Sequence, residues 1–267
     1  MLRLRFLTAL ACVAALSACE KNAVQSITTP VSGAFVRFHN YGVATPGVNF
    51  YANDQKLTAI SNAVCTPPPT TPNPACTTTG VESTTGVVYG SVASGGNYAM
   101  VAPGQYTFSS RIASTTDNGL AVSSAPATLA DGKFYSYFVS GIYSASAKTA
   151  DAFVVEDALP TSFDYTKTYV RVVNTSSNSP SITVTAALQS GGGTVPIASA
   201  VAYKAASPFI TTVPGLTDVT VTITGGTPVT FKGLNLVGGH VYSLALRGDA
   251  TSNSSTTGLI VVATVNR

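Results

Sequence analysis

Short runs of alternating apolar and polar residues, separated by Gly, Pro, Asn and Ser, follow one another from Ala34 onward. A period of two with β-branched and aromatic side chains is typical of β-strands, and the turn-forming residues mark strand ends. No amphipathic pattern of ten or more residues indicates a helix after the N-terminal leader. The pattern predicts an all-β protein, with first-half strands at 34–40, 48–52, 87–89, 98–101, 105–108, 134–139 and 152–155.

The second half of the chain repeats stretches of the first half in the same order. The spacing between the copies shortens along the chain, so the first copy carries extra loop sequence, including the proline-rich stretch 65–76. Two tandem β-modules explain this pattern better than one large barrel does. The matching stretches are Phe35–Asn40 with Tyr169–Asn174, Val101–Thr107 with Val213–Val219, and Leu129–Ser136 with Leu236–Ser243.

The repeat predicts how the chain is divided. We expect each module to have enough residues for a sandwich core of its own. Because the joint is polar and contains Pro160, we expect few core contacts to cross it and expect the modules to fold separately. The predicted segments are a signal peptide at 1–18, a lipidated tether at 19–33, a first β-sandwich at 34–157, a linker at 158–167 and a second β-sandwich at 168–267.

The N-terminus has the pattern of a bacterial lipoprotein leader. Two arginines precede an apolar run too short to span a membrane, and small residues stand before a cysteine in Leu16-Ser17-Ala18-Cys19. This pattern predicts cleavage before Cys19 and a lipid on its thiol. An ordinary signal peptide cut after Ala18 is the alternative. Residue 20 is Glu, and by resemblance to proteobacterial lipoproteins the lack of Asp there favours the outer membrane.

Composition excludes some classes of function. Charged residues make up 9% of the chain, and loss of Arg3 and Arg5 with the leader lowers the net charge from +3 to +1. No basic surface is therefore expected for nucleic acid. After the leader no apolar stretch approaches eighteen residues, so no further membrane span is expected.

Two cysteines remain once Cys12 leaves with the leader and Cys19 takes the lipid. Cys65 and Cys76 flank a proline-rich stretch, and a pair in an oxidising compartment predicts a disulfide. The alternative is a metal site with two thiolates, but no histidine stands nearby in the sequence to complete it.

Arg37 and Arg171 occupy matching points of the two repeats, each within apolar alternation. We expect each arginine to lie on the solvent-side face or to pair with a carboxylate near a sheet edge. A ligand-binding role is the less favoured alternative, because the same position recurs in both modules.

The sequence shows no catalytic motif, and we predict no catalytic residue, no cofactor and no metal. His39 ends one strand pattern and His240 enters another, so we expect both to be surface or strand-end residues. Glu156-Asp157 with Asp164 could hold calcium, but we interpret them as solvated linker acids.

The repeated stretches together resemble the DUF4397 family, a domain of unknown function in bacterial envelope proteins. The likeness rests on Val36–Asn40, Val48–Asn53, Val101–Phe108 and Leu129–Tyr135, and the second module keeps Val170–Asn174 and Gly239–Tyr242. The family's short Asn-Gly hairpin is absent at Val184–Ala187, and the first module departs from it at Asn53-Asp54-Gln55. The resemblance implies antiparallel β-sandwiches of immunoglobulin or transthyretin type and no known activity.

These observations favour a non-enzymatic lipoprotein of the cell envelope with a binding, adhesion or structural role. Its expected partners are the membrane, through Cys19, and an envelope protein or glycan. A glycan- or peptide-binding module of an envelope complex is the second hypothesis. A hydrolase is the third, and it requires polar residues that converge in a pocket between the modules.

Overall fold

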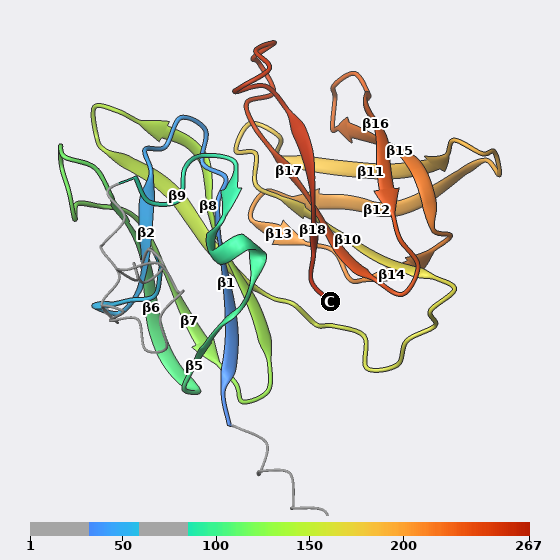
Figure 1. The fold of residues 1–267 in the computed structure, drawn as a ribbon. Coiled ribbons are helices and arrows are strands. Elements are labelled where there is room, and N and C mark those ends of the chain that lie inside the picture. The colour runs from blue at the N-terminus through green and yellow to red at the C-terminus, as the bar shows by residue number, and fades with distance from the viewer. Residues whose placement is uncertain (1–31, 59–84) are drawn as a thin grey trace, which may run out of the picture. The chain divides into compact units, whose positions relative to one another are not determined.

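The computed structural model describes residues 32–58 and 85–267, which form two β-sandwiches, one from each half of the chain (Figure 1). The described residues of Gly33–Arg267 belong to one compact unit. The helical element of the described residues is a 3₁₀ turn at Ala93–Gly96. None of their helices has the length and apolar character needed to cross a membrane. The all-β prediction is therefore confirmed for the part of the chain that the structure describes.

The first sandwich consists of two sheets. One has the strand order β4-β1-β8-β9, with β5 also paired to β1, and the other has the order β3-β2-β6-β7. The strands are β1 (Ala34–Asn40), β2 (Val48–Ala52), β3 (Gln55–Lys56), β4 (Ser91–Val92), β5 (Ala99–Val101), β6 (Gly104–Ile112), β7 (Ala121–Leu129), β8 (Phe134–Ser144) and β9 (Thr149–Glu156).

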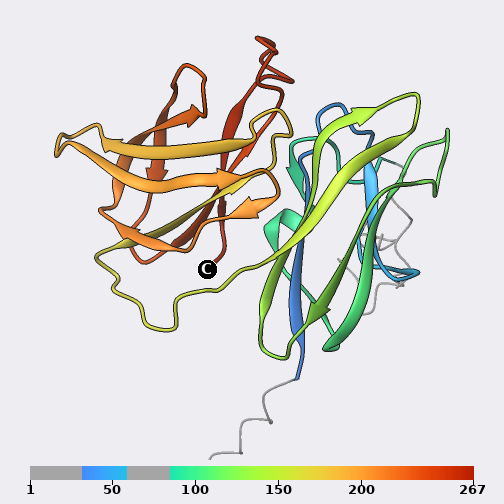
Figure 2. The same cartoon turned by 180° about the vertical axis from the view of Figure 1, so that it is seen from behind.

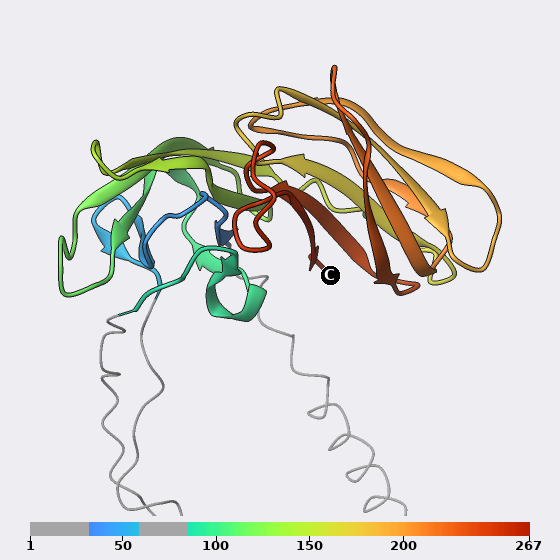
Figure 3. The same ribbon diagram turned by 90° about the horizontal axis from the view of Figure 1, so that it is seen from above.

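The second sandwich repeats this topology strand for strand. Its sheets have the orders β13-β10-β17-β18, with β14 also paired to β10, and β12-β11-β15-β16. Figure 2 shows the two sandwiches from behind. The view from above shows the red strands β17 and β18 side by side (Figure 3). The strands are β10 (Thr168–Asn174), β11 (Ser181–Leu188), β12 (Thr194–Ala202), β13 (Ala205–Ala206), β14 (Ile210–Thr212), β15 (Gly215–Ile223), β16 (Val229–Leu236), β17 (Val241–Arg247) and β18 (Ile260–Val265). The tandem modules are confirmed.

The prediction of purely antiparallel sandwiches is wrong in one respect. β1 runs parallel to β8, with Arg37 opposite Ser136, and β10 runs parallel to β17, with Arg171 opposite Ser243. Parallel neighbours need a long crossover connection, and here the chain builds the whole opposite sheet between the two strands.

The strand expected at Val87–Tyr89 is also displaced. Only Val87 bridges to Val48, and the paired strand β4 lies further along at Ser91–Val92.

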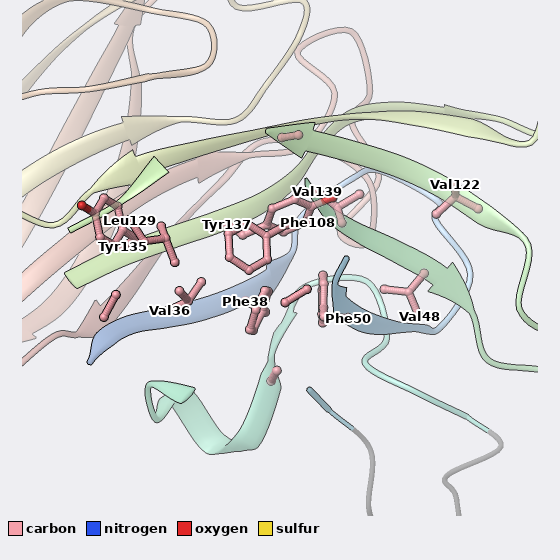
Figure 4. Close-up of a cluster of buried hydrophobic side chains, with 14 of the residues drawn as sticks. Val36, Phe38, Val48, Phe50, Phe108, Val122, Leu129, Tyr135, Tyr137 and Val139 are labelled. Atoms are coloured by element: carbon pink, nitrogen blue, oxygen red, sulfur yellow. The ribbon is translucent and has the colours of Figure 1, made fainter. Parts of the chain in front are cut away.

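The two cores are made of different side chains. In the first sandwich, aromatic rings meet between the sheets, with Phe38 stacked on Phe50 at 5.0 Å and tilted to Tyr137 at 5.9 Å (Figure 4). Burial raises the pKa of Tyr137 to about 12, and its hydroxyl finds a partner in Ser123 Oγ at 2.9 Å. The second core is mainly aliphatic, with Ile182, Leu244 and several valines fully or nearly fully buried. Each module thus has a core of its own.

Candidate functional site between the two sandwiches

The central strands of both sandwiches are buried on both faces. All residues of β10 are buried, and so are all residues of β1 except Phe35. Val36 and Phe38 lie in the first core, so Arg37 and His39 lie on the opposite face, because side chains alternate along a strand. A third apolar cluster covers this opposite face. Its buried members are Tyr41, Phe138, Phe153, Val173 and Ala245.

This third cluster corrects the expectation that few core contacts cross the joint. It contains residues of both modules, with partly buried Val92 and Val155 from the first and Ala206 and Val262 from the second. The polar composition of 158–167 reflects the linker alone and does not indicate how the two modules contact each other. The contact itself is made by the outer faces of strands that lie elsewhere in the sequence.

A buried ion pair crosses the same interface. The side chains of Arg171 and Asp157 are 2% and 0% exposed, and Nη2 of Arg171 donates to Oδ1 of Asp157. Nε of Arg171 donates to Oγ of Ser243 at 2.8 Å, and Nη1 donates to the carbonyl oxygen of Glu156 at 3.0 Å. A buried charge is tolerated only where it is paired and hydrogen-bonded, and Arg171 meets both conditions.

Asp157 also accepts hydrogen bonds from residues of its own module. Its Oδ2 accepts hydrogen bonds from the hydroxyls of Tyr98 and Ser136, each at 2.7 Å. Burial raises the pKa of Tyr98 well above its usual range, and the Asp157 carboxylate raises it further. The carboxylate therefore ties β8, the segment before β5 and the second module together.

Arg37 makes the reciprocal contact. Arg37 is 2% exposed, and its Nη1 donates to Oδ1 of Asn266 at 2.8 Å. Nδ2 of Asn266 donates in turn to Oγ of Ser243 at 2.7 Å. The guanidinium also lies 4.0 Å from the ring centre of Tyr98. Burial lowers the pKa of Arg37, and its Nε has no hydrogen-bond partner.

The contacts of the two arginines are approximately equivalent: the side-chain contact that each arginine makes to the other module has a counterpart in the opposite direction. Arg37 and Arg171 stand at matching strand positions, opposite Ser136 and Ser243. Asp157 directly follows β9, and Asn266 directly follows β18. Each arginine reaches the polar residue that follows the last strand of the other module. Each also lies near an aromatic ring of its own module, Tyr98 for Arg37 and Phe209 for Arg171.

The contacts at the rim of the interface are reciprocal in the same way. Tyr203 of the second module contacts Oγ of Ser140 at 3.1 Å and donates to Oδ2 of Asp151 at 2.8 Å. In the first module the corresponding residue is Tyr89, whose ring lies 4.7 Å from the Arg247 guanidinium. The backbone also crosses the interface, since the amide of Gly141 donates to the carbonyl oxygen of Thr175 at 3.0 Å.

Gly141 permits this close approach. Its φ is +70°, and a Cβ atom there would stand 2.7 Å from the hydroxyl oxygen of Tyr203. A side chain at this position would be strained by the positive φ and would force the Tyr203 side chain to shift.

The two alternatives expected for the arginines, a solvent-side position or a carboxylate partner, have different outcomes. Neither lies on a solvent-side face. Arg171 does pair with a carboxylate directly after an edge strand, as the second alternative expected. The partner of Arg37 is an amide.

His39 and His240 also have different outcomes. His39 is the next-to-last residue of β1, as the strand-end alternative expected, but it is 2% exposed, so the surface alternative is wrong. His240 directly precedes β17 and is partly buried, with Nδ1 3.1 Å from the carbonyl oxygen of Gly238.

Of the three linker acids, Glu156 and Asp164 are exposed as expected, and Asp157 is not. Asp157 is buried, Glu156 pairs with Lys133 at 3.0 Å, and exposed Asp164 accepts hydrogen bonds from Thr166, which lower its pKa. Within the described residues, no group of three or more His, Cys, Asp or Glu is placed to hold a metal ion.

A groove of about 830 Å³ lies between the linker and the segment that leads into β14. Tyr169 and Arg171 line it from β10, and Pro160 and Phe209 line its sides. The hydroxyl of Tyr169 holds the linker in place, because it accepts from the Asp164 amide at 2.7 Å and lies 3.4 Å from the carbonyl oxygen of Ser162. The groove combines aromatic and proline surfaces with charged groups that are already paired.

The predicted lipidation residue Cys19 and the predicted disulfide partners Cys65 and Cys76 lie outside the described residues. Sequence reasoning did not identify Asp157 and Asn266 as interface residues. A signal was present, since each repeat that carries a buried arginine ends with Asp or Asn directly after its last strand.

The fold and the interface define a class of protein with two tandem β-sandwiches joined face to face through buried polar pairs. The chain belongs to the family described as a domain of unknown function, DUF4397, which matches residues 34–185 and 168–266. The family resemblance seen in the sequence is thus confirmed.

No curated protein matches the chain. Among solved structures, the chain is similar to the Bacillus anthracis TIE protein, with 10% sequence identity and a TM-score of 0.21. The match covers 80% of this chain and 34% of that chain, so the chain spans about a third of its length.

Proposed function

We propose that the chain is a lipid-anchored protein of the bacterial cell envelope with a non-catalytic binding, adhesion or structural role. The anchor is supported by the leader and by Leu16-Ser17-Ala18-Cys19. Glu20 supports delivery to the outer membrane. The proposal includes sandwiches of immunoglobulin or transthyretin type, as the family resemblance implies, and a disulfide between Cys65 and Cys76.

The observation that carries the non-catalytic role is the use of the buried charged groups at the interface. Arg37, Arg171 and Asp157 donate and accept hydrogen bonds that hold the two sandwiches together. Groups fixed in this way serve a structural purpose, because moving a proton or binding a substrate would break the contacts between the modules.

A glycan- or peptide-binding module is the second candidate, and the groove beside the linker favours it. Clefts of this size between structural units, lined by aromatic and aliphatic side chains with a few polar groups, are typical ligand sites. A hydrolase has less support. The groove lining contains Arg171 and Glu156, both already paired, and its described residues include no histidine.

The anchor is tested by metabolic labelling with a palmitate analogue. Cys19→Ala should abolish the label and release the protein from membranes, whereas Cys12→Ala, in the leader, should leave both unchanged. Undiminished labelling of Cys19→Ala would contradict the proposal.

The groove is tested by affinity capture from intact envelopes. Thr211 lines the groove and is exposed, so Thr211→Arg should fill part of the groove and remove a captured component. Exposed Thr194 in β12 is not part of the groove lining, and Thr194→Arg serves as the matched control. Equal capture by the two variants would exclude the groove as the binding site.

A further inference from the structure

His39 is a buried histidine in the interface between the sandwiches. It is 2% exposed, and neither of its ring nitrogens has a hydrogen-bond partner. Its ring stacks on Phe138 at 4.3 Å and is tilted to Tyr41 at 5.1 Å. Phe138 and Tyr41 belong to the cluster that joins the two modules. The imidazole is thus packed as an apolar ring, although it has two polar atoms.

The charged groups around His39 are mostly positive. Arg37 lies on the same face of β1, Arg171 acts on it from β10, and Arg247 of β17 lies 5.9 Å from the ring centre of Tyr41. The neighbouring strand positions are Val92 in β4 and Phe138 in β8, which carry no charge.

The carboxylate of this region, Asp157, is already bonded to Arg171, Tyr98 and Ser136. Burial, followed by the charges of Arg37 and Arg171, holds the pKa of His39 well below its usual value. A proton on His39 would therefore lack both an acceptor and a compensating negative charge.

We propose that His39 makes the docking of the two sandwiches sensitive to acid, so that they are held together at neutral pH and released when the ring is protonated. Separation of the two faces would give the ring access to water. It would leave Val36 and Phe38, on the other face of β1, in the core of the first sandwich. Release therefore requires no unfolding of either module.

The direction follows from proton linkage. Undocked His39 has an ordinary pKa of about 6.5, and docked His39 has a lower one. The undocked state therefore binds more protons at acidic pH. Docking keeps its full strength above about pH 7 and weakens as the pH falls from about 6.5 towards the pKa of the docked state.

Two backbone amides separate undocking from unfolding. The amide of Gly141 donates to Thr175 across the interface, whereas the amide of Tyr41 donates to Val139 within the first sandwich. Hydrogen exchange of the full chain, corrected for the intrinsic effect of pH, should show protection of Gly141 falling about tenfold per pH unit below about pH 6. Protection of Tyr41 should stay constant over the same range.

The matched variant is His39→Val, because the corresponding residue of the second module is Val173. In His39→Val the protection of Gly141 should not depend on pH, and His240→Gln should keep the wild-type response. If valine prevents folding, His39→Leu answers the same question with a larger apolar side chain. The proposal is overturned if the His39 variant keeps the acid response, if wild-type Gly141 shows none, or if Gly141 and Tyr41 lose protection together.

Discussion

At the residue scale, the two buried arginines occupy the same position but are not equally satisfied. Arg171 uses Nε, Nη1 and Nη2, and its charge faces a carboxylate. Arg37 has an amide partner, and its Nε has none. Removal of one partner of a buried pair is costly because it leaves the other charge unpaired. We therefore expect the ion pair of Arg171 to be the more important of the two for stability.

Replacing Asp157 tests how much the buried ion pair contributes to stability. Asp157→Ala would leave Arg171, Tyr98 and Ser136 without their shared acceptor, so we expect a loss of about 3–5 kcal/mol in the free energy of unfolding. Asp54 pairs with Arg111 but is 96% exposed, so Asp54→Ala should cost less than about 1 kcal/mol. Urea denaturation measures both values. Similar losses for the two variants would show that the buried pair has no special weight.

The cysteine pair gives a second prediction at this scale. A Cys65–Cys76 disulfide would close a short loop and contribute about 3 kcal/mol at most, and less if the prolines already restrict the loop. Thiol titration of the denatured, unreduced protein should find neither cysteine free. Detection of both as free thiols would disprove the bond.

The residue-level errors of sequence reasoning have one cause. Alternation along β1 puts Arg37 and His39 on the face opposite Val36 and Phe38. Alternation does not reveal what covers that face, and here the covering element is a sheet more than 100 residues away in the chain. The groove was not predictable for the same reason, since its lining combines the linker, β10 and the segment before β14.

At the element scale, strands with clear alternation were predictable, and irregular strands were not. The expected β1 and β2 have the observed bounds. β7 was missed because Ala121–Leu129 contains Pro126 and two serines, a composition that a sheet edge tolerates. The two-residue strands β3, β4 and β13 have too few residues to show a period.

Each module also uses an asparagine at the end of its first strand to hold the following loop. Nδ2 of Asn40 donates to the carbonyl oxygens of Pro46 and Val87, and Nδ2 of Asn174 donates to those of Ser179 and Val201. Both asparagines are fully buried. The recurring Asn in the two sequence repeats thus has a structural explanation.

Asn174→Ala should therefore destabilise the second sandwich. It would leave two buried carbonyl oxygens without these donors, and unsatisfied groups of this kind cost about 1–3 kcal/mol each. Exposed Asn235 in β16 provides the control, and Asn235→Ala should change stability by less than about 0.5 kcal/mol. Equal midpoints for the two variants in thermal melts would show that the asparagine does not hold the loop.

At the scale of the whole molecule, the modules have separate cores and a shared interface. The core of the second module is complete in itself, but Val173 and Ala245 are buried in the cluster shared with the first. The sizes at matching positions differ, with Phe138 and Phe153 in the first module where the second has Ala245 and Val262. The first module thus supplies large rings, and the second supplies small side chains.

These contacts lead to a prediction for the second half alone. A chain of Ser162–Arg267 keeps its own core and the contacts of Tyr169 with the linker, so it should show a β-type circular dichroism spectrum and a cooperative melt. Its midpoint should lie below that of the full mature chain, because Val173 and Ala245 lose their cover. An unfolded spectrum would show that the shared interface is required for folding.

The exchanged pairing of the two arginines has an evolutionary consequence. In a symmetric dimer the two subunits make the same contacts in both directions, so that a residue of each subunit meets the equivalent partner residue of the other. The contacts of the two arginines follow this reciprocal pattern. Gene duplication and fusion of a single-module ancestor that paired with itself would produce this arrangement. Once both copies were encoded in one chain, a substitution in one module no longer appeared at the equivalent position of the other. The two modules now differ at equivalent positions: one arginine contacts Asp157 and the other Asn266, and Phe138 corresponds to Ala245. Such differences between the two halves of the interface could arise only after the fusion, because both subunits of a symmetric dimer have the same sequence.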